Sequence, residues 1–133
     1  MKTTALIEMG KDGTYTVYTS ELDSVIIGTG DAVAEAKADF ENSVQEILQM
    51  YKEDNINLPD ELVGVEFEYK YDLASFFSFY KWINATQFAK IAGINTSLMR
   101  KYKAGITYIS EKQTQKIEKT LHRLGAELTA VKL

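Results

Sequence analysis

The period of the hydrophobic pattern changes near residue 71. In VGVEFEYKY, residues 63–71, apolar and charged side chains alternate, which predicts a β-strand with one buried face. From Asp72 onward, apolar residues recur every three or four positions, which is typical of helices. We therefore expect an α+β chain of two units, with a sheet-containing unit over residues 1–71 and a mainly helical unit over residues 72–133. Units this small gain stability by packing or by dimerisation.

Three strands, a helix and a fourth strand are predicted for the first unit. Residues 4–10 and 14–20 are β-rich runs on either side of the turn signal KDG, which predicts a hairpin, and residues 24–30 predict a third strand. Residues 31–55 predict a long amphipathic helix with Asp31 as its N-cap. Its predicted apolar stripe consists of Val33, Ala36, Phe40, Val44, Ile47, Leu48 and Tyr51. Together with the alternating strand, these elements give the order βββαβ.

The second unit is predicted to begin with a helix and to end with a helix followed by a short strand. Asp72 is the predicted cap of the first, and Trp82 is expected to cover a seam beside it. Ser110 and Gln113 form a candidate capping box for the last helix, which we expect to end at Gly125. ELTAVKL at the C-terminus then predicts a short final strand, which we hypothesise pairs across a dimer.

NATQFAKIAGINTSLMRKYKAG, residues 84–105, predicts two helices that cross over a tight turn. A small residue where the helices touch and a turn residue that tolerates positive φ are what a helix-turn-helix needs, and Ala89 and Gly93 match these requirements. Asn84 and Asn95 are the predicted caps, and Gly105 ends the second helix. The predicted inward side chains are Phe88, Ala89, Ala92, Ile94, Met99 and Tyr102.

The outward side of the second helix carries polar and basic residues. Short polar side chains at a helix N-terminus permit close approach to DNA bases, arginine binds guanine at two atoms, and lysines neutralise phosphates. The alternative is the solvated basic face of an ordinary helical bundle. The outward residues are Thr96, Ser97, Arg100, Lys101 and Lys103.

Charge is distributed unevenly along the chain. The formal net charge of −4 combines 5 Lys or Arg with 15 Asp or Glu in residues 1–70, and 10 Lys or Arg with 4 Asp or Glu in residues 71–133. The two parts therefore carry −10 and +6. Such asymmetry indicates a nucleic-acid-binding module joined to an acidic unit.

Composition argues against several classes of enzyme. The chain has no cysteine and only one histidine, His122, so we expect no disulfide, metal site or histidine-based catalytic centre. Glu8 on the first strand has no convincing acidic partner for a two-metal nuclease site, and we expect no catalytic activity and no cofactor. No signal peptide or membrane-length apolar run is evident, which predicts a soluble, cytoplasmic protein.

The segments FAKIAGIN and SLMRKYKAG, with the following SEKQ, resemble the phage-repressor (XRE-like) type of helix-turn-helix. The resemblance implies that Thr96, Ser97, Arg100 and Lys101 read DNA bases. It also implies contacts with DNA phosphates by Asn84, Asn95, Lys103, Thr107, Tyr108 and Lys112.

The N-terminal part of the chain, about residues 3–54, resembles the HicB antitoxin domain, a partial RNase H-like fold. The features that carry the resemblance are the hairpin at Gly13–Tyr15, the Glu21-Leu22 pair after the second strand, and Gly30-Asp31 before the helix. The resemblance implies a type II antitoxin that caps a small, basic, RNA-cleaving HicA-like toxin. It also implies a repressor that binds the operator DNA of its own operon as a homodimer or a higher homo-oligomer.

A second function remains open at this point. The chain is equally compatible with a stand-alone transcriptional regulator whose first unit dimerises or senses a small ligand. A neighbouring gene for a small basic protein would distinguish the two functions.

Overall fold

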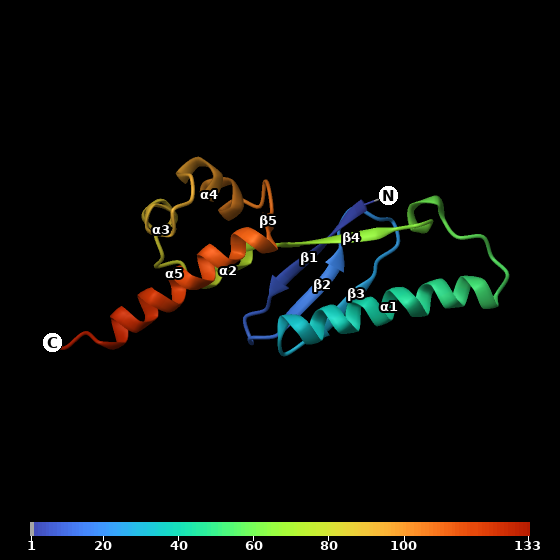
Figure 1. Cartoon of the computed structure of the whole chain (residues 1–133), viewed down its shortest axis with the longest axis horizontal. Coiled ribbons are helices and arrows are strands. Elements are labelled where there is room, and N and C mark those ends of the chain that lie inside the picture. Colours follow the sequence, from blue (N-terminus) through green and yellow to red (C-terminus); the bar gives the residue numbers. More distant parts are fainter. Residues whose placement is uncertain (1) are drawn as a thin grey trace. The chain divides into compact units, whose positions relative to one another are not determined.

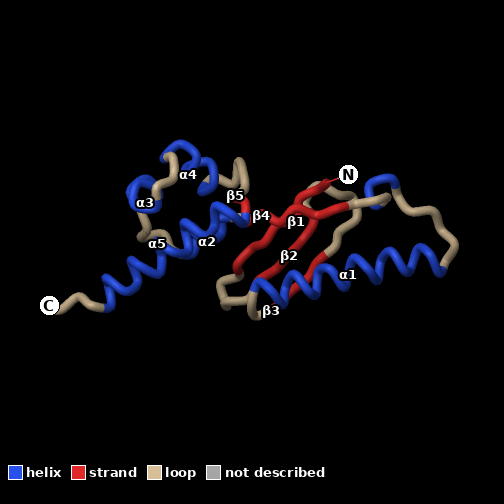
Figure 2. The backbone as a smooth tube through the Cα atoms, viewed as in Figure 1, coloured by secondary structure: helices blue, strands red, loops and turns tan. Residues whose placement is uncertain are grey.

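The computed structural model describes residues 2–133 and shows a mixed α+β protein (Figures 1 and 2). Two compact units follow one another along the chain, Met1–Lys70 and Tyr71–Leu133. None of the helices in residues 2–133 combines the length and apolar composition needed to cross a membrane.

The first unit is a sheet covered by one long helix. Its strands lie in the hydrogen-bonded order β3-β2-β1-β4, in which β1 and β3 are both antiparallel to β2. After β3 the chain passes through α1 and η1, a short 3₁₀ helix, before β4 forms beside β1. The elements are β1 (Lys2–Met9), β2 (Tyr15–Thr19), β3 (Ile27–Gly30), α1 (Val33–Glu53), η1 (Asp60–Leu62) and β4 (Glu66–Tyr71). This is the predicted order of strands and helix.

The core of the first unit lies between α1 and the sheet (Figure 1). Ala36, Phe40 and Val44 recur at helical spacing and are buried, which confirms the centre of the predicted stripe. The Phe40 ring meets Phe67 edge-on, with ring centroids 5.0 Å apart. Farther along α1, the predicted stripe residues Ile47, Leu48 and Tyr51 are only half-buried.

Three predicted boundaries in the first unit are wrong. The N-cap of α1 is Ala32, while the Asp31 N–H donates to the Glu35 carboxylate at 3.0 Å. Strand β3 starts at Ile27 rather than residue 24, since the Ser24 N–H donates to the Glu61 carboxylate and the Ser24 carbonyl accepts the Thr19 hydroxyl, so neither joins a strand ladder. Strand β4 starts at Glu66, after Gly64 turns with φ 61°.

The second unit contains four helices and one two-residue strand among its described residues. Asp72 caps the first helix as predicted, because its side chain accepts the Ala74 N–H at 3.0 Å. Ser110 caps the last helix, accepting the Gln113 N–H at 3.3 Å. The elements are α2 (Leu73–Phe79), α3 (Ala85–Ala92), α4 (Thr96–Lys103), β5 (Ile109–Ser110) and α5 (Glu111–Thr129).

Three predictions for the second unit are wrong: the helix end at Gly125, the final strand, and the covered seam at Trp82. Helix α5 runs through Gly125 to Thr129, so residues 127–133 form no strand and cannot pair as one across a dimer. Gly125 does not have the positive φ of a C-terminal cap, and a helical glycine costs only about 1 kcal/mol relative to alanine. Trp82 covers no seam within the described chain, because its side chain is 74% exposed.

Candidate nucleic-acid interface

Helix α3 is anchored at its start by Asn84. The Asn84 side-chain oxygen accepts the Gln87 N–H at 3.0 Å, which satisfies one of the donors that every helix start leaves free. Phe88 and Ala89 on the next turn are buried. The Phe88 ring packs edge-on against Phe77 of α2, with centroids 6.4 Å apart. The cap and the core contacts together fix this short helix.

The turn after α3 depends on Gly93. Its φ of 73° and ψ of 33° are in the left-handed region, which a residue without a Cβ adopts at little cost. The Ile94 N–H donates to the Ala89 carbonyl at 2.9 Å, and the Ile94 side chain is buried. The chain therefore reverses within a few residues and begins α4 beside α3, as the sequence predicts.

Helix α4 has one buried side and one exposed side. Asn95 caps it by accepting the Leu98 N–H at 3.0 Å. Met99 and Tyr102 are buried in the core of the unit, and burial raises the pKa of Tyr102. Gly105, with φ 72°, follows the last turn, and the Ile106 N–H donates to the Lys101 carbonyl at 3.0 Å. Caps at both ends keep eight residues helical.

The exposed side of α4 carries the residues predicted to read bases. Ser97, Arg100 and Lys101 are exposed, and Thr96 is half-buried at the helix start. The Arg100 guanidinium donates to the Ser97 hydroxyl at 3.3 Å, so these two side chains lie on one surface. The structure therefore exposes Ser97, Arg100 and Lys101 on the side of α4 away from the buried Met99 and Tyr102, with Thr96 at the edge of that side.

The residues predicted to contact phosphates fall into three groups. Asn84 and Asn95 use their side-chain oxygens as helix caps, which leaves their amide nitrogens as the groups that can donate to a phosphate. Thr107 and Tyr108 are half-buried in the loop after α4. Lys103 and Lys112 are exposed on α4 and in the first turn of α5.

The sequence around this pair of helices is free of acidic residues. Residues 73–110 contain no Asp or Glu, but they contain Lys81, Lys90, Arg100, Lys101 and Lys103. All five basic residues are exposed. A chain segment with exposed cations and no carboxylates favours a polyanionic ligand. Comparisons with protein-family models, with curated proteins and with solved structures found no match.

The predicted site residues did not include Lys81 and Lys90, which are the other exposed basic residues of this acid-free segment. Neither lies on the second helix, whose outward positions carried the prediction. The absence of acidic residues from position 73 onward, well before α4, could have pointed to both lysines. Trp82, adjacent to Lys81, adds an exposed aromatic ring to the same segment.

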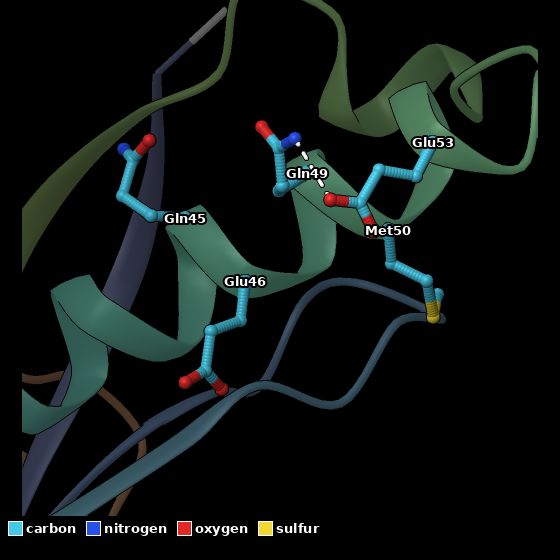
Figure 3. A pocket seen from close by; sticks show the side chains of 5 residues that line it. All are labelled: Gln45, Glu46, Gln49, Met50 and Glu53. Atoms are coloured by element: carbon cyan, nitrogen blue, oxygen red, sulfur yellow. Dashed lines mark hydrogen bonds between the residues drawn. The ribbon is translucent and has the colours of Figure 1, made fainter.

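The outer side of α1 offers a different kind of surface. Figure 3 shows a shallow depression lined by Gln45, Glu46, Gln49, Met50 and Glu53, in which the Gln49 amide donates to Glu53 at 3.1 Å. Every lining residue belongs to one helix, so no groups from separate elements converge as they do in ligand pockets. Within residues 2–133, no three side chains of the metal-binding types come together to hold an ion.

Proposed function

We propose that the α3–α4 pair is a helix-turn-helix and that α4 binds operator DNA in the major groove. The observation that carries the proposal is the exposed Arg100 and Lys101 on a helix held by Asn95 and Met99, within a segment free of acids. A helix side that carries basic and no acidic residues attracts phosphates. The cap and the buried residues of α4 fix which side chains can reach the base edges.

Each exposed residue of α4 has a role in this proposal. Arg100 binds guanine, for which its guanidinium supplies two donors, and its contact with Ser97 limits the orientations that the side chain samples. Thr96 and Ser97 bind base edges or phosphates near the N-terminus of α4. Lys101 reads base edges beside Arg100 while its charge offsets nearby phosphates, and Lys103 and Lys112 contact the phosphate backbone.

We also propose that the first unit is an antitoxin domain that neutralises a small, basic, HicA-like toxin. Support comes from the sequence resemblance, from the βββαβ order with sheet order β3-β2-β1-β4, and from the charge of −10. Acidic side chains on α1, including Glu46 and Glu53, offer electrostatic complementarity to an RNA-binding protein surface. The whole protein is then a cytoplasmic antitoxin that represses its own operon.

Two experiments test the two parts separately. Fluorescence anisotropy with duplex DNA from upstream of the gene tests DNA binding, and we expect tighter binding than to a scrambled duplex at equal salt. Co-expression with the product of an adjacent gene tests the antitoxin role, and we expect a stable complex with a small basic protein. Specific DNA binding without such a complex would support the stand-alone regulator instead.

A further inference from the structure

The apolar stripe of α5 continues past the point at which its own unit covers it. Leu121 and Leu124 are half-buried against the core of the unit. Leu128 and Val131 follow on the same side but are 61% and 58% exposed. Residues 125–133 are exposed throughout, and the last turns of α5 extend away from α2, α3 and α4 (Figure 1). Within residues 2–133, nothing covers this end of the stripe.

The stripe has the spacing of a coiled-coil seam. Leu121, Leu124, Leu128 and Val131 are separated by three, four and three residues, which are successive a and d positions of a heptad. Helix α5 ends at Thr129, and the Val131 N–H donates to the Leu128 carbonyl at 3.3 Å, so the chain makes one more turn before Val131. A narrow a/d stripe suits a second helix better than it suits a sheet.

We propose that α5 pairs antiparallel with α5 of a second copy of this chain, about a two-fold axis at the level of Ala126. This axis places Leu124 against Leu128 of the second copy. It also places Leu121 against Val131 of the second copy. The three-four-three spacing reads the same in both directions from Ala126, so one helix supplies both halves of the seam. A two-fold interface requires this self-complementarity.

The antiparallel direction follows from burial. In a parallel pair, the N-terminal half of each α5 would face the other, yet Ile117 and Thr120 in that half are already buried in their own unit. In the antiparallel pair, the uncovered end with Leu128 lies against the half-buried middle of the other helix. Each copy then covers the exposed seam residues Leu128 and Val131 of the other.

Charges beside the seam agree with the same arrangement. Glu118 on one flank lies opposite Lys132 of the second copy, and the symmetry repeats this pair of opposite charges. On the other flank, Glu127 faces its symmetry mate near the axis. The Glu127 carboxylate lies 4.0 Å from Arg123 Nε of its own helix, which offsets that repulsion.

Sedimentation equilibrium of the full chain tests the pairing. The inference concerns self-association and does not depend on what α4 or the first unit binds. At about 100 µM, a concentration suited to a small interface, we expect a mass of at least twice the 15.0 kDa chain. Leu128→Glu should halve that mass and raise the dissociation constant about 100-fold, because each of the two copies then places one charged side chain in the apolar seam.

Ala126→Glu is the matched control, since it adds the same charge on the exposed opposite side of α5 and should leave the mass unchanged. Circular dichroism should show that Leu128→Glu folds, as its side chain is exposed. Glu118→Lys and Lys132→Glu should each weaken the dimer, and the double variant should restore it. A wild-type monomer, a folded Leu128→Glu variant of unchanged mass, or a double variant no tighter than the single ones would overturn the proposal.

Discussion

Gly28 of β3 lies against the backbone of Phe40 in α1, so closely that an added β-carbon would come within 2.1 Å of the Phe40 nitrogen. It would also lie 2.5 Å from the Phe40 Cα. Backbone atoms cannot rotate aside as a flexible side chain does. Residue 28 therefore limits how closely α1 covers the sheet.

We predict that Gly28→Ala lowers the free energy of unfolding by about 3 kcal/mol, since helix α1 must shift to admit the methyl group. Urea unfolding followed by circular dichroism measures the loss. Thr29→Ala, at the next position of the same strand, is the control, because the Thr29 side chain is exposed and its loss should cost under about 1 kcal/mol. Equal effects of the two substitutions would contradict the close packing.

The cap of α4 leads to a second prediction. Asn95→Ala removes the acceptor of the Leu98 N–H and should lower the free energy of unfolding by about 1 kcal/mol. Asn95→Ser keeps a hydroxyl acceptor at the same position and should retain most of that stability. If both variants unfold at the same urea concentration as the wild type, the cap contributes nothing to the fold.

A loop in the first unit is held by one carboxylate whose behaviour with pH is testable. Glu61 accepts the Ser24 hydroxyl at 2.7 Å and the Ser24 and Asp23 N–H groups at 2.9 and 3.0 Å. These hydrogen bonds, that of the Ser24 hydroxyl above all, hold the pKa of the Glu61 carboxyl below its usual 4.5. The tether is therefore present above pH 4.5 and is lost as the pH falls through the lowered pKa.

The Ser24 amide resonance should report this transition. In a ¹H–¹⁵N titration, we expect its chemical shift to change with a midpoint below 4.5, and to stay flat through that range in Glu61→Gln. A midpoint at or above the ordinary value would show that the three hydrogen bonds do not favour the charged carboxylate in solution.

Tyr102 gives a prediction at alkaline pH. Burial raises its pKa above the ordinary 10.0, so the folded state holds the phenol proton more tightly than the unfolded chain. The stability from this proton is complete below pH 10 and is lost as the pH rises through the higher folded pKa. The free energy of unfolding should therefore fall less steeply above pH 10 in Tyr102→Phe than in the wild type. Parallel curves would contradict the burial argument.

The local features of the second unit were predictable because they depend on a few neighbouring residues. Asn84, Gly93 and Asn95 act through hydrogen bonds or backbone angles within four positions of themselves. Helical spacing then separates the buried Met99 and Tyr102 from the exposed Arg100 and Lys101. Both the shape of the pair and the side it exposes follow from these local rules.

Features that depend on distant neighbours were not predictable. Gly125 looks like a helix end, but its φ is not positive and the helix continues to Thr129. Trp82 is expected to cover a seam, yet 74% of its surface is exposed in the described chain.

The salt dependence of DNA binding tests the central claim most directly. We predict that Arg100→Ala combined with Lys101→Ala weakens binding to the upstream duplex about 100-fold and makes the negative slope of log K against log salt less steep by about two. Lys2→Ala combined with Lys11→Ala changes the net charge equally, on exposed residues of the first unit, and should change neither quantity. An Arg100/Lys101 variant that binds with wild-type affinity and wild-type slope would contradict the assignment of α4 as the DNA-binding helix.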